Sequence, residues 1–117
     1  MEIIKATEKH IPEILELWIE FMKHHEEIDP RFPMRAEAPA NFEIHIRKQM
    51  EAEDTLVLAA LDEGGTVGFA VANIASYPPI FEFEKYGAID SITVETRSRR
   101  KGIGDQLMDK IYEWFDS

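Results

Sequence analysis

The feature that most constrains the fold of this chain is a strand that runs directly into an amphipathic helix. The segment Gly87–Glu95 has the character of a strand through Ile89, Ile92 and Val94. A helix is expected to begin near Gly102, because apolar residues then recur at helical spacing. The members of that apolar face are Ile103, Leu107, Met108, Ile111, Trp114 and Phe115. Only a short connection, between Glu95 and Gly102, therefore joins the strand to the helix.

That connection is strongly basic in a chain that is otherwise acidic. The formal net charge is −10, yet four of the 13 basic residues fall between Arg97 and Lys101. The first N–H groups of a helix lack partners within the helix and favour anions. Gly102 and Gly104 would let a phosphate approach the backbone, and neighbouring cations could neutralise it. The pattern favours an anion site, with a solvated loop or a nucleic-acid patch as the alternatives.

The rest of the chain reads as short elements of a single α/β domain over residues 1–117. Helices are indicated by apolar spacing and by proline in a first turn, and strands by apolar runs that flank a glycine-containing turn. The expected elements are a strand at Glu2–Lys5, helices from about Thr7 to Glu27 and from about Pro39 to Glu53, strands at Leu56–Leu61 and Val67–Ile74 around the turn Asp62–Gly65, the strand Gly87–Glu95 and the last helix. Trp18, Phe21, Trp114 and Phe115 are interpreted as core residues.

Composition excludes several classes of function. The chain has no cysteine, which rules out disulfides, thiolate metal sites and a cysteine nucleophile. A net charge of −10 argues against nonspecific binding to nucleic acid or to acidic membranes. Apolar runs stay well below the roughly 20 residues that span a bilayer, so a cytoplasmic location is expected. The run His24-His25-Glu26-Glu27 does not have the spacing of a zinc motif and is interpreted as a solvated helix end, so no metal is expected.

The glycine turn also excludes two familiar phosphate motifs and points to a third. The first is excluded because the glycines are not followed by a lysine and then a Ser or Thr. The second is excluded because the third glycine of a dinucleotide fingerprint is missing. What remains is R-x-x-G-x-G, Arg99 to Gly104, directly after a strand. With its flanking elements this closely resembles the central motif of the GNAT superfamily of N-acetyltransferases. The resemblance implies a mixed, mainly antiparallel sheet flanked by helices in the order β-α-α-β-β-β-α, with the family's usual C-terminal strand-helix-strand portion absent, so that a truncated form is expected.

The resemblance implies acetyl-CoA as co-substrate and direct transfer of the acetyl group to a primary amine in a ternary complex. Carried over to this chain, it places the pyrophosphate against six residues: Arg99, Arg100, Lys101, Gly102, Gly104 and Asp105. Asp105 departs from the pattern, since a small or basic residue is usual there. Ile92 and Val94 would meet pantetheine and the acetyl group through their backbone edges. The alternative is a catalytically incomplete module that binds CoA or acyl-CoA, or a fragment that depends on a partner.

Several residues are candidates for the acid and the base of such a reaction. Asp90 is expected on the same strand face as Ile92 and Val94, where it could take a proton from the amine, with a structural carboxylate as the alternative. Glu82, Glu84 and Tyr86 compete for that role, and Arg31 or Phe32 could contact the substrate. A homodimer is expected, because a sheet that ends at its fourth strand exposes an edge. The identity of the amine stays open.

Overall fold

The structure of the chain is a computed structural model, and it describes residues 1–29, 31, 36–76, 78–80, 82, 85–95, 98 and 102–116. Its elements are β1 (Glu2–Lys5), a 3₁₀ turn η1 (Glu8–His10), α1 (Ile11–Ile28), α2 (Ala38–Glu51), β2 (Thr55–Asp62), β3 (Gly65–Ser76), β4 (Lys85–Val94) and α3 (Ile103–Phe115). The order of elements expected from the sequence is confirmed. The first helix is shorter than expected, because residues 8–10 form a separate 3₁₀ turn.

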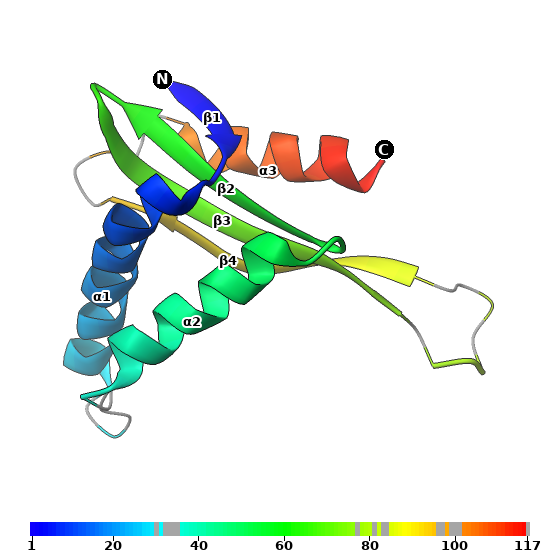
Figure 1. Cartoon of the computed structure of the whole chain (residues 1–117), viewed down its shortest axis with the longest axis horizontal. Helices are drawn as coiled ribbons and strands as arrows, with labels where there is room; N and C mark the ends of the chain where they lie inside the picture. Colours follow the sequence, from blue (N-terminus) through cyan, green and yellow to red (C-terminus); the bar gives the residue numbers. More distant parts are fainter. Residues whose placement is uncertain are drawn as a thin grey trace.

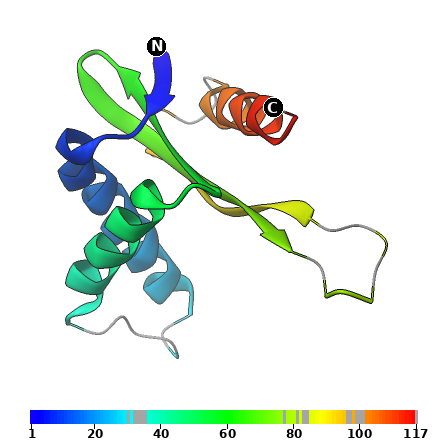
Figure 2. The same cartoon turned by 45° about the vertical axis from the view of Figure 1, so that its right-hand side comes forward.

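The four strands form one sheet in the order β1-β2-β3-β4, and all three pairings are antiparallel. The expected parallel component of a mixed sheet does not occur among these described strands. Helices α1 and α2 cover one face of the sheet and α3 covers the other (Figure 1). The same three layers are visible after a 45° turn, and the far ends of β3 and β4 project as an arm beyond the helices (Figure 2).

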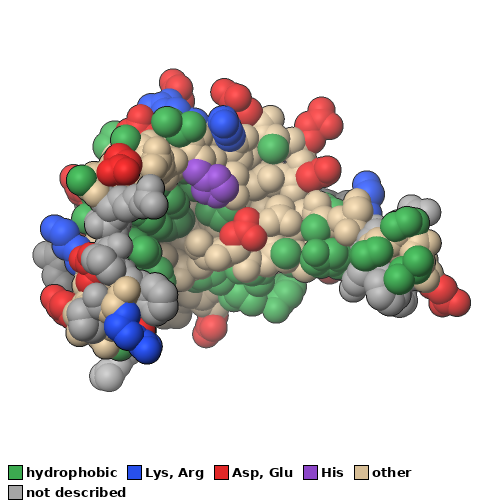
Figure 3. Space-filling model, turned by 90° about the horizontal axis from the view of Figure 1, so that it is seen from below, with side chains coloured by type: hydrophobic (Ala, Val, Ile, Leu, Met, Phe, Trp, Pro, Cys, Tyr) green, Lys and Arg blue, Asp and Glu red, His purple; other side chains and the backbone are tan. Residues whose placement is uncertain are grey.

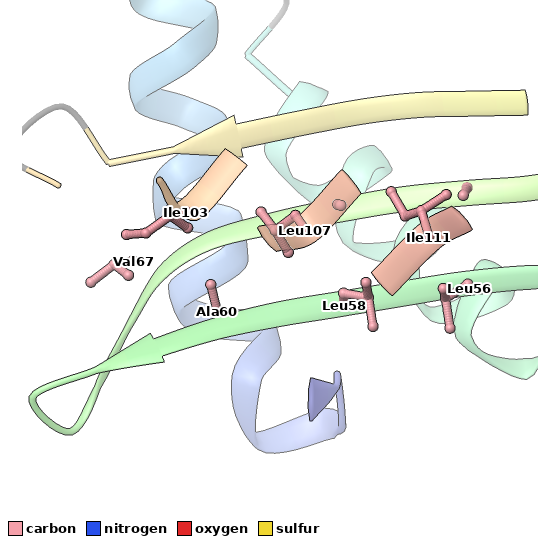
Figure 4. Close-up of a cluster of buried hydrophobic side chains, with 9 residues drawn as sticks. Leu56, Leu58, Ala60, Val67, Ile103, Leu107 and Ile111 are labelled. Carbon is pink, nitrogen blue, oxygen red and sulfur yellow. The ribbon is translucent and has the colours of Figure 1, made fainter. Parts of the chain in front are cut away.

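The core on the α3 face follows directly from the apolar spacing of the last helix. Ile103, Leu107 and Ile111 lie four residues apart and are at most 2% exposed. They point at the β2 and β3 side chains Leu56, Leu58, Ala60 and Val67 (Figure 4). Ile92 and Val94 of β4 pack against the same cluster. This packing fixes the start of α3 beside the end of β4.

The core on the opposite face joins α1 and α2 to the middle of the sheet. It contains Ile11, Ile14, Leu17, Ile46, Val57, Phe69 and Val71. The rings of Trp18 and Phe42 stack at 4.4 Å between centroids and 5° between planes, which locks the two helices together. The interpretation of Trp18 as a packing residue is therefore confirmed.

No helix in the described ranges is long and apolar enough to cross a membrane.

Two local irregularities shape the sheet. The β2–β3 turn is a two-residue loop in which Glu63 (φ 52°) and Gly64 (φ 85°) both have positive φ, as a type I′ turn requires. In β4, Ser91 pairs with Val71 but Ile89 pairs with Ala72, so Asp90 is an extra, unpaired residue. This is a β-bulge, and such insertions redirect side chains and often occur next to functional sites.

Candidate functional site

The N-terminus of α3 opens onto a hollow of about 450 Å³. The helix begins after Gly102 without a side-chain cap from the described residues, and its first internal hydrogen bond runs from Gln106 N–H to Gly102 O at 3.1 Å. The N–H groups of residues 103–105 are thus available to an anion. The walls are Phe21, Ile92, Thr93, Val94, Ser98, Gly102, Ile103, Gly104 and Asp105.

The two glycines of the motif play different parts in this geometry. Gly102 has φ 77°, a left-handed conformation that other residues rarely adopt, so a side chain there would strain the turn. Gly104 has no such constraint, and a Cβ added to it would meet no atom within 4 Å in the described structure. A Cβ at position 104 would therefore have open space among the described residues, in a helix turn that lines the hollow.

The edge of β4 forms one wall of the same hollow. Ile92, Thr93 and Val94 all line it, although successive strand residues point to opposite faces. A surface shared by three consecutive residues must run along the backbone edge of the strand. Among the described strands β4 pairs only with β3, so this edge presents N–H and C=O groups to a bound molecule.

The structure thus brings together five of the residues predicted to bind the cofactor: Ile92, Val94, Gly102, Gly104 and Asp105. The other three, Arg99, Arg100 and Lys101, lie outside the described residues, as does Arg97. Asp105 lines the hollow as an exposed side chain in the first turn of α3. Its position suits the helix dipole, while its charge would repel a phosphate in the same hollow.

A second hollow of about 590 Å³ lies between α1 and the end of β4. It shares Phe21, Thr93 and Val94 with the first hollow, so the two adjoin at these residues. Its remaining walls come from α1: Glu16, Leu17, Ile19, Glu20, Lys23, His24 and Glu27. Phe21, which the sequence placed in the core, is 36% exposed and stands where the two hollows meet. That prediction was wrong, because the helical face carrying Phe21 turns from the core toward the hollows.

The acidic wall of α1 was missed by the sequence analysis, although a signal for it exists. Glu13, Glu16, Glu20 and Glu27 are spaced by three, four and seven residues, which places them on one side of a helix. His24 lies in the same wall, with its Nδ1 3.9 Å from Glu27 Oε2. In the described part of the chain no group of three or more His, Asp or Glu side chains is arranged to hold a metal.

Asp90 lies on the opposite sheet face from the one expected. Ile92 and Val94 pack against the α3 cluster, whereas the Asp90 carboxylate accepts hydrogen bonds from Asn73 Nδ2 at 2.7 Å and from Gln49 Nε2 at 3.4 Å, on the α2 side. The extra residue of the bulge breaks the alternation on which the expectation rested. Asp90 is also not among the residues that line either hollow.

The remaining candidates lie away from the two hollows. Tyr86 and Glu82 belong to the region of the projecting arm, and both are exposed. Glu84 and Phe32 fall outside the described residues. Arg31 bonds to Asp29, with Nε 2.8 Å from Oδ1 and Nη2 3.0 Å from Oδ2. That guanidinium lowers the pKa of the Asp29 carboxyl below its ordinary value.

Comparison with known proteins establishes the family. Residues 12–117 match the model of the acetyltransferase (GNAT) family, which is most of the chain. The chain therefore belongs to the GNAT acetyltransferase family. A search of curated protein sequences found no match.

Solved structures of low sequence identity share the fold. An aminoglycoside 6'-N-acetyltransferase from Acinetobacter haemolyticus has a TM-score of 0.75 at 20% identity, over 97% of this chain and 70% of that one. An acetyltransferase from Vibrio fischeri has a TM-score of 0.78 at 18% identity, over 99% and 87%. The enzyme AAC(6')-Iy, in complex with a bisubstrate analogue of CoA and acetylneamine, has a TM-score of 0.64 at 21% identity, over 98% and 71%.

Proposed function

We propose that this chain binds acetyl-CoA in the hollow at the start of α3 and transfers the acetyl group to a primary amine held in the second hollow. The observation that carries the proposal is the junction of the two hollows at Phe21, Thr93 and Val94. Pyrophosphate would rest on the free N–H groups of α3, and pantetheine would follow the edge of β4 toward that junction. The solved complex of AAC(6')-Iy with a bisubstrate analogue supports the choice of co-substrate.

The chemistry follows from this placement. The neutral amine nitrogen attacks the thioester carbonyl, so that a C–N bond forms, the C–S bond breaks and the sulfur leaves as CoA thiol after taking a proton. A backbone N–H on the open edge of β4 would stabilise the developing oxyanion. The amine must lose a proton, and Asp90 stays our predicted acceptor, acting through water. Glu16 and Glu20 are carboxylates in the wall of the second hollow itself.

The test is release of free CoA thiol in the presence of acetyl-CoA and a panel of amines. Direct transfer predicts that release requires both substrates and that no acetyl label stays on the protein when the amine is omitted. Labelling of the protein in the absence of an amine would contradict direct transfer.

A second candidate is a module that binds CoA or acyl-CoA without turnover. One observation favours it: the predicted base, Asp90, does not line either hollow. Calorimetric binding of CoA without thiol release for any amine would select this candidate over the enzyme.

A homodimer is also part of the proposal. The part of the β4 edge that lies on the projecting arm, away from Ile92 to Val94, and exposed apolar side chains such as Ile80, which is 84% exposed, give a second copy a surface to cover. Figure 3 shows hydrophobic side chains gathered on the projecting arm. Light scattering that reports only monomer at high concentration would remove this part. The cytoplasmic location stays a prediction.

A further inference from the structure

A third hollow, of about 620 Å³, lies where the first half of α1 meets the β2–β3 turn. Six carboxylate residues contribute to its walls, and no Lys or Arg from the described residues does. The six are Glu13, Glu16, Glu20, Asp62, Glu63 and Glu95. The charge that the described residues give this wall favours a cation over an anion.

Thr66 supplies an independent sign that this hollow binds a ligand. The residue is 5% exposed and lines the hollow, yet its Oγ1 is the one buried side-chain polar atom in the described structure that has no hydrogen-bond partner. A buried polar group left unpaired destabilises the fold and calls for an explanation. An ammonium group has three N–H donors, and one of them could satisfy this oxygen.

The neighbouring carboxylate is already oriented. The backbone N–H of Thr66 donates to Glu13 Oε2 at 2.9 Å, which ties the Glu13 side chain of α1 to the first residues of β3. Glu13 and Thr66 therefore lie side by side in the lining of this hollow. A cation placed there meets a carboxylate that has lost part of its rotational freedom before binding.

The third hollow adjoins the second. They share Glu16, Leu17 and Glu20, so a chain-like molecule laid along α1 would contact the walls of both. From Glu13 to Phe21 is eight residues of helix, or roughly 12 Å at 1.5 Å per residue. A single small amine cannot reach from the acidic hollow to the junction, whereas an extended molecule with an amine at each end can.

We propose that the acceptor is a linear polyamine whose distal ammonium is bound by Glu13 and Thr66 in the third hollow while its other end reaches the junction at Val94. The inference rests on the proposed function for the reacting end and adds the class of substrate. The distal ammonium stays protonated and is held by charge and hydrogen bonds, and only the reacting amine loses its proton.

Calorimetry with spermidine and with butylamine as the matched monoamine tests the binding part without any need for turnover. Spermidine is expected to bind at least tenfold more tightly than butylamine. Glu13→Gln, which keeps an oxygen for the Thr66 N–H, should weaken spermidine binding at least tenfold. Glu51→Gln removes the same charge from the exposed end of α2 and should leave it unchanged. Equal affinity for the two amines, or equal affinity in wild type and Glu13→Gln, would overturn the inference.

Thr66→Val separates a binding role from a structural one. Valine has the shape of threonine, and the lost hydroxyl has no partner, so the free variant should melt at the same temperature or higher. Its affinity for spermidine should still fall at least threefold. A variant that binds spermidine as tightly as the wild type would exclude the hydroxyl from the site and overturn its assignment.

Kinetics with α,ω-diamines of increasing length distinguish the two levels of the proposal. The ratio of kcat/KM for a diamine to that for its matched monoamine should rise once the diamine spans both hollows, and Glu13→Gln should abolish the rise. If the enzyme is active but this ratio does not change with diamine length, the polyamine proposal is overturned while the proposed acetyl transfer is retained. Tight spermidine binding with no transfer to any amine overturns the enzyme and leaves the cation site standing.

Discussion

The side-chain amide of Asn73 donates a 2.7 Å hydrogen bond to the carboxylate of Asp90, which ties the bulge of β4 to β3. Asp90→Asn keeps an oxygen acceptor for that bond but cannot take a proton. If Asp90 is the base, acting through water, we expect kcat to fall at least tenfold with the KM for acetyl-CoA unchanged. Steady-state kinetics measure both. Wild-type kcat in Asp90→Asn, with loss of stability only in Asp90→Ala, would assign the residue a purely structural role.

Gly104→Val is expected to weaken CoA binding at least tenfold, a loss of about 1.4 kcal/mol. A Cβ at this position meets no described atom within 4 Å, so the expected effect of valine is to obstruct a bound pyrophosphate. The circular dichroism spectrum of the variant should match that of the wild type, and calorimetric titration of CoA gives the affinity. Gln106→Val, on the exposed side of the same helix, controls for the helix propensity of valine. Arg100→Ala should weaken binding less, because a screened charge is lost while the N–H groups stay in place. Unchanged affinity in Gly104→Val would remove the proposed site.

Gly87→Ala should destabilise the fold by about 1–3 kcal/mol, because overpacking forces neighbours to move. A Cβ at this position would lie 2.6 Å from the Cζ atom of Phe115, so the Phe115 ring would have to move from its place against β4. Urea denaturation measures the free energy of unfolding. Combining the change with Phe115→Leu should recover part of the loss, and strict additivity of the two effects would contradict the contact.

Arg31→Ala should raise the pKa of Asp29 toward its ordinary value, since the hydrogen-bonded guanidinium is what lowers it. A carboxyl whose pKa is lower in the folded chain contributes stability above its unfolded pKa, and this contribution is lost as the pH falls through the folded pKa. The variant should therefore lose a small, acid-sensitive part of its stability. A two-dimensional NMR titration of the Asp29 carboxyl follows the shift directly. An identical pKa in both proteins would show that the pair does not form in solution.

The fold was largely predictable because its elements carry strong local patterns. The apolar spacing of Ile103, Leu107 and Ile111 and the Gly-containing turn between β2 and β3 each indicate one structure. Boundaries moved where local chemistry competes, as at Thr7, whose backbone N–H bonds to His10 Nδ1 at 2.9 Å and sets off a 3₁₀ turn before α1.

The site was predictable only in part. The turn Gly102 to Asp105 could be predicted because its glycines lie between a strand pattern and a helix pattern in the sequence. The face of Asp90 was predicted wrongly, since a bulge depends on how β4 pairs with β3 and leaves no mark in the residues of β4 alone. The acidic wall of α1 needed the same helical spacing that identified the core, applied to glutamate instead of to apolar residues.

The antiparallel order of the sheet also implies an order of assembly. Strands β2, β3 and β4 are neighbours both in sequence and in space, and the two-residue turn at Glu63 and Gly64 brings the first pair together at little entropic cost. Strand β1 is different, because Lys5 pairs with Leu58 across both intervening helices. Closing a loop of that size loses chain entropy, and this loss is offset only once the paired strands β2, β3 and β4 offer an edge to β1. We expect β1 to dock last during folding and to be the first strand to exchange its amide hydrogens in the native protein.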